Sequence, residues 1–433
     1  MFRSLSCACG VWLIAIGLAV GAERVEPPPD AASVSAPALT LRQAIESALR
    51  GNPALQLFAF QFRIQDARVQ QAGLKPAPAL SFGVENFLGT GEARGLHTAE
   101  ATFAISQVIE LGGKREARIG AAQAGTSLVE ADRQAGQLDV LAEVTRRFIM
   151  VASRQEQLRL ARSATQLNEQ TVTGAEERVN AARSPHVELD RAQIALSRAR
   201  LVERRAETEL ESARKQLAAL WGESELILNG QLVGGVDADL FQLPAVGEYA
   251  DLVRRMADNP DFLRFASEAR LRDAELRLVA TLRKPDLTLT GGIRQLQGSN
   301  DQAFVASVSM PLFAGRRAEG YVAEARAQRE RVDVERRVAR VRAEAMLQEL
   351  YQELSASVQE AGTLRTDVLP RAEEALQETK YAYERGRYSY LELVDAQREY
   401  LAIQSALIEA SSNAHALRAE IERLTNSPLT GAP

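Results

Sequence analysis

The chain has 433 residues, a formal net charge of −5 and only 5% aromatic residues. Charges of both signs are mixed along the sequence, so no basic patch indicates nucleic acid as a partner. Alanine, glutamate, arginine, glutamine and leucine abound, which is typical of long helices packed side by side, either in one elongated body or in a soluble coiled coil.

The first segment, residues 1–22, is predicted to be an export signal. A basic residue precedes the apolar run 11–20, and small residues follow it at the expected cleavage site. The mature chain is then expected to begin at Glu23. Cys7 and Cys9 precede the apolar run, so the mature chain would hold no thiol, which excludes disulfides and cysteine-based metal sites. A retained membrane anchor is the alternative, disfavoured because the run is short for a spanning helix.

Two helices are predicted after a flexible lead-in. Residues 23–38 are rich in proline and alanine and form the lead-in. Thr40 is an N-cap candidate, and apolar residues then recur at helical spacing up to the Asn-Pro pair at 52–53. A second helix is predicted to run to about Gly73, because a proline-rich stretch follows it.

Two pairs of strands are predicted from alternating apolar and polar residues. Each strand has about nine to eleven residues, the length that crosses a bilayer when the strand is tilted. Polar, glycine-rich loops join the strands of each pair. The alternative is two ordinary soluble hairpins. The predicted strands are about 79–88, 98–107, 286–294 and 303–311.

Each strand pair is followed by a very long predicted helix. Residues 113–183 contain no proline and keep apolar residues at helical spacing, which predicts a helix of about 70 residues and about 105 Å. Its counterpart spans 315–386, and Pro370 predicts a kink or a local break there. Helices of this length must bury their apolar stripes against neighbours.

These elements form an internal duplication with an offset of about 204 residues. Short motifs recur in order, such as Asn52-Pro53 and Asn259-Pro260. This period is too long for a solenoid unit, so it indicates a duplicated half-protein whose halves build one pseudo-symmetric wall. The predicted organisation is a first repeat at 39–230, a connector at 231–246, a second repeat at 247–426 and a tail at 427–433.

No catalytic, metal or cofactor site is predicted. His97, His186 and His415 are far apart in sequence and are expected to be surface residues. No metalloprotease, nucleophile-elbow, phosphate-loop or dinucleotide motif occurs. An enzyme is therefore disfavoured.

The second long hairpin carries a family resemblance. Residues 367–376, Tyr383, Gly386 and the run 389–397 resemble the last hairpin of TolC-type outer-membrane efflux proteins. The segment 105–118 resembles the strand-to-helix junction of the CzcC-like, heavy-metal branch of that family. Four strands cannot close a membrane barrel alone, and oligomerisation solves this problem.

The resemblance implies an α+β fold, mostly α, in a homotrimer. Three chains would form a 12-stranded β-barrel in outer-membrane lipid, continued by a long α-helical barrel in the periplasm. The implied function is a passive exit duct for heavy-metal cations, driven by an inner-membrane RND transporter through a periplasmic adaptor (membrane fusion protein). One alternative is a channel of the same fold for drugs or other small molecules. A secreted coiled-coil scaffold or adhesin without a pore is the alternative from another class.

Four residues near the second predicted turn are expected to form a periplasmic gate: Glu392, Asp395, Tyr383 and Arg387. Glu392 and Asp395 are spaced i, i+3, so they share one helix face. The resemblance implies that each becomes a ring of three carboxylates that selects cations and holds the entrance narrow. It also implies that the Tyr383 hydroxyl helps to lock the closed tip, with Arg387 as an additional donor. The alternative for the two carboxylates is a solvated helix N-terminus, favoured by the helix dipole.

The two turns that end the long helices are expected to lie together at the periplasmic tip. Each turn, 183–189 and 386–393, ends a long helix at the same distance from the strands. Helical hairpins of an adaptor would pack into the grooves between them. The predicted docking residues are Ser184, Pro185, Val187, Leu189, Gly386, Ser389, Leu391 and Leu393.

Overall fold

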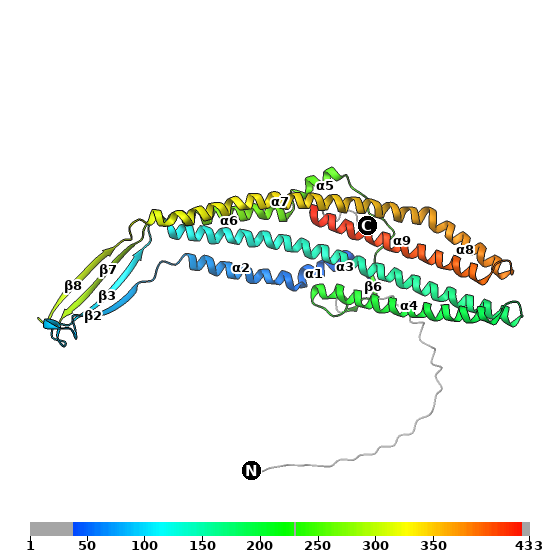
Figure 1. The fold of residues 1–433 in the computed structure, drawn as a ribbon, viewed down its shortest axis with the longest axis horizontal. Coiled ribbons are helices and arrows are strands. Elements are labelled where there is room, and N and C mark those ends of the chain that lie inside the picture. Colours follow the sequence, from blue (N-terminus) through cyan, green and yellow to red (C-terminus); the bar gives the residue numbers. More distant parts are fainter. Residues whose placement is uncertain (1–37, 229–230, 427–433) are drawn as a thin grey trace, which may run out of the picture. The chain divides into compact units, whose positions relative to one another are not determined.

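The computed structural model describes residues 38–228 and 231–426 (Figure 1). The predicted export signal, residues 23–37 of the predicted lead-in and the predicted tail at 427–433 lie outside the described residues. Among the helices of the described ranges, none is long and apolar enough to cross a membrane.

The same order of elements occurs twice: two helices, two strands, a long helical arm, a turn and a returning helix. The first set is α1 (Leu41–Gly51), α2 (Pro53–Ala72), β2 (Ala79–Glu85), β3 (Glu100–Ile109), α3 (Lys114–Asn180) and α4 (His186–Ala218). The second set is α5 (Tyr249–Met256), α6 (Pro260–Thr281), β7 (Leu287–Leu296), β8 (Asp301–Ser309), α7 (Ala314–Thr363), α8 (Leu369–Glu384) and α9 (Tyr390–Thr425).

Shorter elements lie before the first set and between the two sets. β1 (Ala38–Leu39) pairs in parallel with β6 (Gly235–Val236), so the last residue of the predicted lead-in belongs to a strand. The side chain of Leu39 is buried in a core formed by α1, α3 and α4, which fixes this start of the chain. The other short elements are β4 (Ile227–Leu228), which pairs with β5 (Gln231–Leu232), and the 3₁₀ turns Gly91–Ala93 and Ala219–Trp221.

The duplicated Asn-Pro pairs have the same structural role in both repeats. Asn52 caps α2 by accepting from the backbone N–H of Ala54 at 2.9 Å, and its amide donates to the carbonyl of Leu220 at 2.8 Å. Asn259 caps α6, and its amide donates to the carbonyls of Arg423 and Leu424 at 2.7 and 3.0 Å. Each asparagine therefore starts a helix and ties it to the end of its own repeat, at the 3₁₀ turn after α4 in the first repeat and at the last turn of α9 in the second.

The four longer strands form one antiparallel sheet in the order β2-β3-β7-β8, which leaves β2 and β8 as its edges. Its strands differ slightly from the predicted ranges. β2 ends at Glu85 rather than near residue 88, because Asn86 and Leu88 take a positive φ and Leu88 donates to Gly95 in a turn. β3 continues to Ile109, and Gly112 and Gly113 come directly before the first residue of α3.

The two long arms differ in continuity. α3 is one helix of 67 residues, which corresponds to about 100 Å. The second arm is α7 and α8 joined by a five-residue π-helical segment, Leu364–Val368, which ends two residues before Pro370. The predicted break at this proline is therefore confirmed, since a proline lacks the backbone donor that a continuous helix needs.

α3 packs against α2 and α6 near the strands and against α4 and α9 beyond them (Figure 1). Two corresponding cores lie at the middle of the helices. One joins α1, α3 and α4, and the other joins α5, α7 and α9. The turns α3–α4 and α8–α9 lie at the end opposite the sheet (Figure 1).

Replacing Asn259 with alanine is expected to destabilise the second repeat by about 1–3 kcal/mol, because a helix cap and two donated bonds disappear together. Asn259→Asp should cost less, since its carboxylate keeps the cap acceptor and loses only the donated bonds. Thermal melting followed by circular dichroism at 222 nm measures both. The matched control is Asn180→Ala at the exposed end of α3. Equal midpoints for Asn259→Ala and the control would contradict the role assigned to the asparagine.

Candidate functional site

One face of the four-stranded sheet is apolar and exposed. The register aligns Phe82, Phe103, Ile293 and Phe304 in one row across all four strands. All four side chains are exposed, and Phe304 is 92% exposed. A continuous exposed apolar surface of this kind marks contact with lipid or with another protein.

The opposite face of the sheet is polar and carries an ion-pair cluster. Arg294 on β7 contacts Glu100 at 2.7 Å, Glu85 at 3.3 Å and the hydroxyl of Thr102 at 3.0 Å. These partners come from β2 and β3, so the cluster links three strands. One apolar face and one polar face fit a sheet with lipid on one side and water on the other.

The sheet and the helical layer leave matching edges open. The helices pack in the order α2, α3, α6, α7, and the strands pair in the order β2, β3, β7, β8. α2 therefore lies at the edge of the helical layer that corresponds to β2, and α7 lies at the edge that corresponds to β8. Both outer helices expose apolar stripes at helical spacing. These are Leu57, Phe60 and Ile64 on α2, and Val334, Val338 and Val341 on α7.

The junction between the sheet and α3 is held by charges. Lys114 is buried and its ammonium contacts the Asp286 carboxylate before β7 at 2.6 Å. Arg118 pairs with Glu110 and also donates to the carbonyl of Leu74 at 3.1 Å. Together these bonds fix the end of α2, the start of α3 and the start of β7. The segment 105–118, which indicated the heavy-metal branch, therefore has a structural role here.

Gly112 makes this junction possible. Its φ is +81°, which favours glycine, and a Cβ there would lie 2.7 Å from the Cδ of Lys284. The chain turns from strand to helix within residues 110–113, of which Gly112 and Gly113 both have a positive φ.

The two turns at the far end of the helices share one apolar core, as expected. Leu189 after the first turn, Tyr383 before the second, and Tyr390 and Leu393 after it are all buried there. Arg178 of α3 links the turns: its Nε donates to the Ser184 hydroxyl at 3.0 Å and its Nη1 donates to the Tyr383 carbonyl. The guanidinium also lies over the Tyr383 ring, 4.5 Å from the centroid. Sequence reasoning missed Arg178.

The predicted gate residues lie near one another in the chain but differ in environment. Glu392 completes a capping box, since its carboxylate accepts from the Ser389 N–H at 2.6 Å and the Ser389 hydroxyl at 2.8 Å. The Ser389 N–H holds the pKa of the Glu392 carboxyl below its usual range, with help from the hydroxyl. The alternative given for Glu392 was a solvated helix N-terminus favoured by the helix dipole, and the capping box places this residue at such an N-terminus. Asp395 and Arg387 are exposed.

Tyr383 is only 4% exposed, and burial raises the pKa of its hydroxyl. Within residues 38–228 and 231–426, this buried hydroxyl has no hydrogen-bond partner. A buried hydroxyl without a partner is costly, so this group lowers the stability of the core between the turns.

The predicted docking residues divide into two groups. Leu189 and Leu393 are 8% and 3% exposed and pack in the core between the turns, so a partner does not reach them in this conformation. Val187 and Leu391 are exposed, as are Pro185, Gly386 and Ser389, and Ser184 is half-buried.

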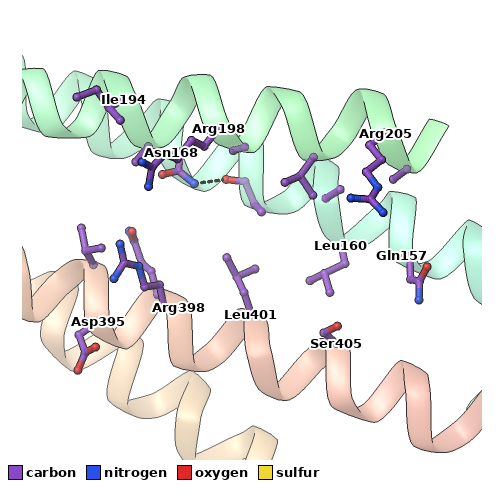
Figure 2. A pocket seen from close by; sticks show the side chains of 18 of the residues that line it. Gln157, Leu160, Asn168, Ile194, Arg198, Arg205, Asp395, Arg398, Leu401 and Ser405 are labelled. Carbon is purple, nitrogen blue, oxygen red and sulfur yellow. Dashed lines mark hydrogen bonds between the residues drawn. The ribbon is translucent and has the colours of Figure 1, made fainter. Parts of the chain in front are cut away.

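A groove lies beside this core, between α4 and α9, with α3 as its third wall (Figure 2). Its volume is about 1400 Å³. Glu392 and Asp395 line it together with five arginines, Arg154, Arg191, Arg198, Arg205 and Arg398. The spacing of Arg191, Arg198 and Arg205, seven residues apart, was the available signal.

The described residues hold no group of three or more histidine, cysteine or carboxylate side chains placed to bind a metal ion. His415 differs from the predicted surface histidine. It is half-buried in α9, where a ring nitrogen lies 3.1 Å from the Leu240 carbonyl, and burial lowers its pKa. Its contact holds the connector between the repeats rather than a ligand.

Comparison with known proteins decides the family. A family model described as outer membrane efflux protein matches residues 44–223 and 253–427, one segment in each repeat. The chain belongs to the outer membrane efflux protein family. The predicted family and the outer-membrane location are thereby confirmed, and this is a family of efflux proteins rather than of enzymes.

Individual relatives agree with this assignment. The cobalt-zinc-cadmium resistance protein CzcC of Cupriavidus metallidurans is 29% identical over 360 residues, 83% of each chain. The nickel-cobalt-cadmium resistance protein NccC of Alcaligenes xylosoxydans xylosoxydans is 25% identical over 307 residues, 68% of this chain and 67% of NccC. The solved outer-membrane channel OprN matches with a TM-score of 0.69 and 18% identity over 89% of each chain, which confirms the predicted fold.

Arg178→Ala is expected to loosen the tip of this efflux protein, because it removes two donated bonds and a cation–π contact at once, worth about 1–3 kcal/mol together. Hydrogen exchange of the backbone amides at 382–390 should become faster. Arg178→Lys should give an intermediate rate, since it keeps the charge but loses the planar fork. The control is Arg385→Ala, whose guanidinium lies over the exposed Tyr381 ring. Unchanged exchange in Arg178→Ala would show that the turns are held without this arginine.

Proposed function

We propose that this protein is the outer-membrane channel of a tripartite efflux pump and exports heavy-metal cations. The names of CzcC and NccC support this cargo, since they specify resistance to cobalt, zinc, cadmium and nickel. A channel for drugs or other small molecules is the second candidate, favoured by the OprN likeness in fold alone.

The proposal rests on the two unpaired edge strands of the sheet, β2 and β8. An unpaired strand edge is not tolerated in lipid, because its backbone groups find no water to bond. A second copy that places its β2 beside β8 satisfies one edge, and repetition of this step closes a ring. Three copies of the four-stranded sheet give the 12 strands of the proposed homotrimer.

The same step brings α2 of one copy to α7 of the next. Their exposed stripes, which include Phe60 and Val338, would then be buried against each other. The apolar face of the sheet would contact outer-membrane lipid, and the polar face with Arg294 would line a water-filled lumen. β3, β7 and β8 have nine or ten residues, the length of a tilted membrane strand.

The helical part would extend into the periplasm and meet the other components of the pump there. The turns lie farthest from the sheet, so they are the contact point for a periplasmic adaptor that connects to an inner-membrane RND transporter (Figure 1). Because Leu189 and Leu393 are buried, the adaptor would contact the exposed members of the predicted docking set, above all Val187 and Leu391.

Deletion of the gene is expected to sensitise cells to divalent cations such as cobalt, zinc and cadmium more than to antibiotics, and the intact gene should restore growth. Phe60→Asp should fail to restore it, because a buried carboxylate at the α2–α7 contact prevents trimer formation. Light scattering of the purified variant in detergent should give a monomer where the wild type gives a trimer.

The control is Gln359→Asp, which introduces the same carboxylate at an exposed position of α7 outside the apolar stripe. Sensitivity to antibiotics without sensitivity to metals would favour the second candidate. A monodisperse wild-type monomer in detergent would rule out the proposed assembly.

The proposed gate residues have two separate roles: Glu392 and Asp395 attract cations, and Tyr383 helps to close the tip. In the trimer, Asp395 and Glu392 would form carboxylate rings that attract cations, so Glu392→Gln with Asp395→Asn should weaken cation preference and relieve block by multivalent cations. Assembly should persist, because glutamine also completes the cap with Ser389. Tyr383→Phe should raise resting conductance without changing selectivity, because it removes the hydroxyl to which the proposal assigns closure of the tip and leaves the carboxylate rings intact. Planar-bilayer recordings measure both effects, and wild-type selectivity in the double variant would place the gate elsewhere.

A further inference from the structure

The end of the sheet that joins the helices is basic (Figure 1). Its connecting segments hold eight basic and four acidic residues, although the whole chain has more acidic than basic residues. At the opposite end of the sheet, residues 85–100 and 294–301 hold four acidic and two basic residues. The two ends of the sheet therefore carry opposite net charge. The basic segments are 73–76, 110–118, 282–286 and 311–319.

Three of the eight basic groups are bonded within the chain. Lys114 pairs with Asp286, and Arg118 pairs with Glu110. The Arg115 Nε donates to a backbone carbonyl at 2.6 Å. These bonds occupy two of the four carboxylates at this end of the sheet.

The other five basic side chains are exposed, and within residues 38–228 and 231–426 none of them has an ion-pair or hydrogen-bond partner. The two remaining carboxylates, Glu116 and Glu319, are exposed as well. Five cations against two carboxylates leave an excess of three positive charges per chain that faces solvent. We call these five residues the basic band: Lys75, Arg283, Lys284, Arg316 and Arg317.

Exposed apolar side chains lie among the basic groups. Leu74 directly precedes Lys75, and Leu282 directly precedes Arg283. The stem of Lys284 lies over Gly112, where a Cβ would come within 3.2 Å of its Cγ, while its ammonium stays unpaired. A lysine or arginine whose stem follows an apolar surface and whose charge lies in water is typical of a membrane interface.

Phe313 is the least expected residue of this region. It is the N-cap of α7 with a φ of +61°, a conformation that is unfavourable for a residue with a Cβ. The first repeat has Gly113, with a φ of +74°, as the N-cap of α3. The Phe313 ring is 75% exposed, and the preceding Leu312 is exposed too. Packing within the chain therefore does not account for the phenylalanine, whereas contact with an external apolar phase does.

We infer that the basic band binds the anionic headgroups of the phospholipid leaflet that faces the periplasm, with Leu312 and Phe313 in the adjoining acyl region. The inference rests on the proposed function, in which the apolar face of the sheet contacts lipid, and it adds a headgroup preference and a depth. The basic groups follow α2, precede β7 and begin α7, so they are spread across the layer. A charged surface with apolar neighbours suits a bilayer leaflet, and a soluble phosphate would make no use of the apolar side chains.

Phe313→Trp supplies a fluorescent reporter for the full-length channel in phosphatidylcholine vesicles that contain brominated phosphatidylglycerol or brominated phosphatidylcholine as the quencher. The reporter should bind the brominated phosphatidylglycerol with about five-fold preference at low salt. The preference should fall at high salt, because the charges are screened. Trp221 packs in the core between α1, α3 and α4, so it gives the same background in every variant.

Arg316→Gln with Arg317→Gln should remove most of the preference. The matched control is Arg336→Gln with Arg337→Gln, an exposed pair farther along the same helix, and it should leave the preference unchanged. Arg316→Gln alone replaces the double variant if light scattering shows that the latter does not assemble. Glycerol phosphate at matched ionic strength should not compete, since the proposed ligand is a leaflet and not a free phosphate.

Equal quenching of the Phe313→Trp reporter by the two lipids, or no quenching by either, would overturn the inference. So would a preference that persists without Arg316 and Arg317, or one that glycerol phosphate abolishes. Phe304→Trp on the apolar face keeps the proposed function separate. If both lipids quench that reporter and the Phe313→Trp reporter shows no preference, only the basic band is refuted, whereas an unquenched Phe304→Trp reporter contradicts the proposed lipid contact of the sheet itself.

Discussion

Hydrogen bonding of the strand edges is the constraint on which the rest of this structure depends. A four-stranded sheet with one exposed apolar face has no stable place in water, and its two open edges have no stable place in lipid. In the proposed trimer both problems are solved between copies of the chain. The helical layer repeats the layout of the sheet, with α2 and α7 at its sides, so one contact between copies can pair the strands and bury the helical stripes together.

The helices in turn depend on a few polar residues placed where elements meet. Lys114 and Arg118 hold the strand-to-helix junction, and Arg178 holds the two turns together. Between these points the long arms are fastened mostly by small and aliphatic side chains, with buried bonds such as that of Gln397 to the Thr171 hydroxyl at 2.9 Å. The polar contacts therefore set where each helix begins, turns and ends, and apolar packing sets how the helices lie side by side.

The order of elements was predictable from the sequence because each depends on local periodicity and local breakers. Thr40 caps α1, and Pro370 interrupts the second arm, for reasons contained within a few residues. The meeting of the turns was also predictable, from equal arm lengths. The environment of single side chains was not, because it depends on partners far away in the chain. Tyr383 is packed by Arg178, and Leu189 is buried by the other hairpin, at separations of about 200 residues.

The hydrogen bonds of the two duplicated asparagines have a consequence for how the two repeats are related. Asn52 joins the start of the first repeat to its end at Leu220, and Asn259 does the same for the second repeat at Leu424. Each repeat is thus a closed unit that contributes one strand pair and one helical hairpin. Six separate copies of such a unit would obey the same edge-pairing rule as three double ones. In the proposed trimer the ring would therefore close without the covalent link between the halves. The link allows the halves to diverge, as the continuous α3 and the interrupted α7–α8 arm have done.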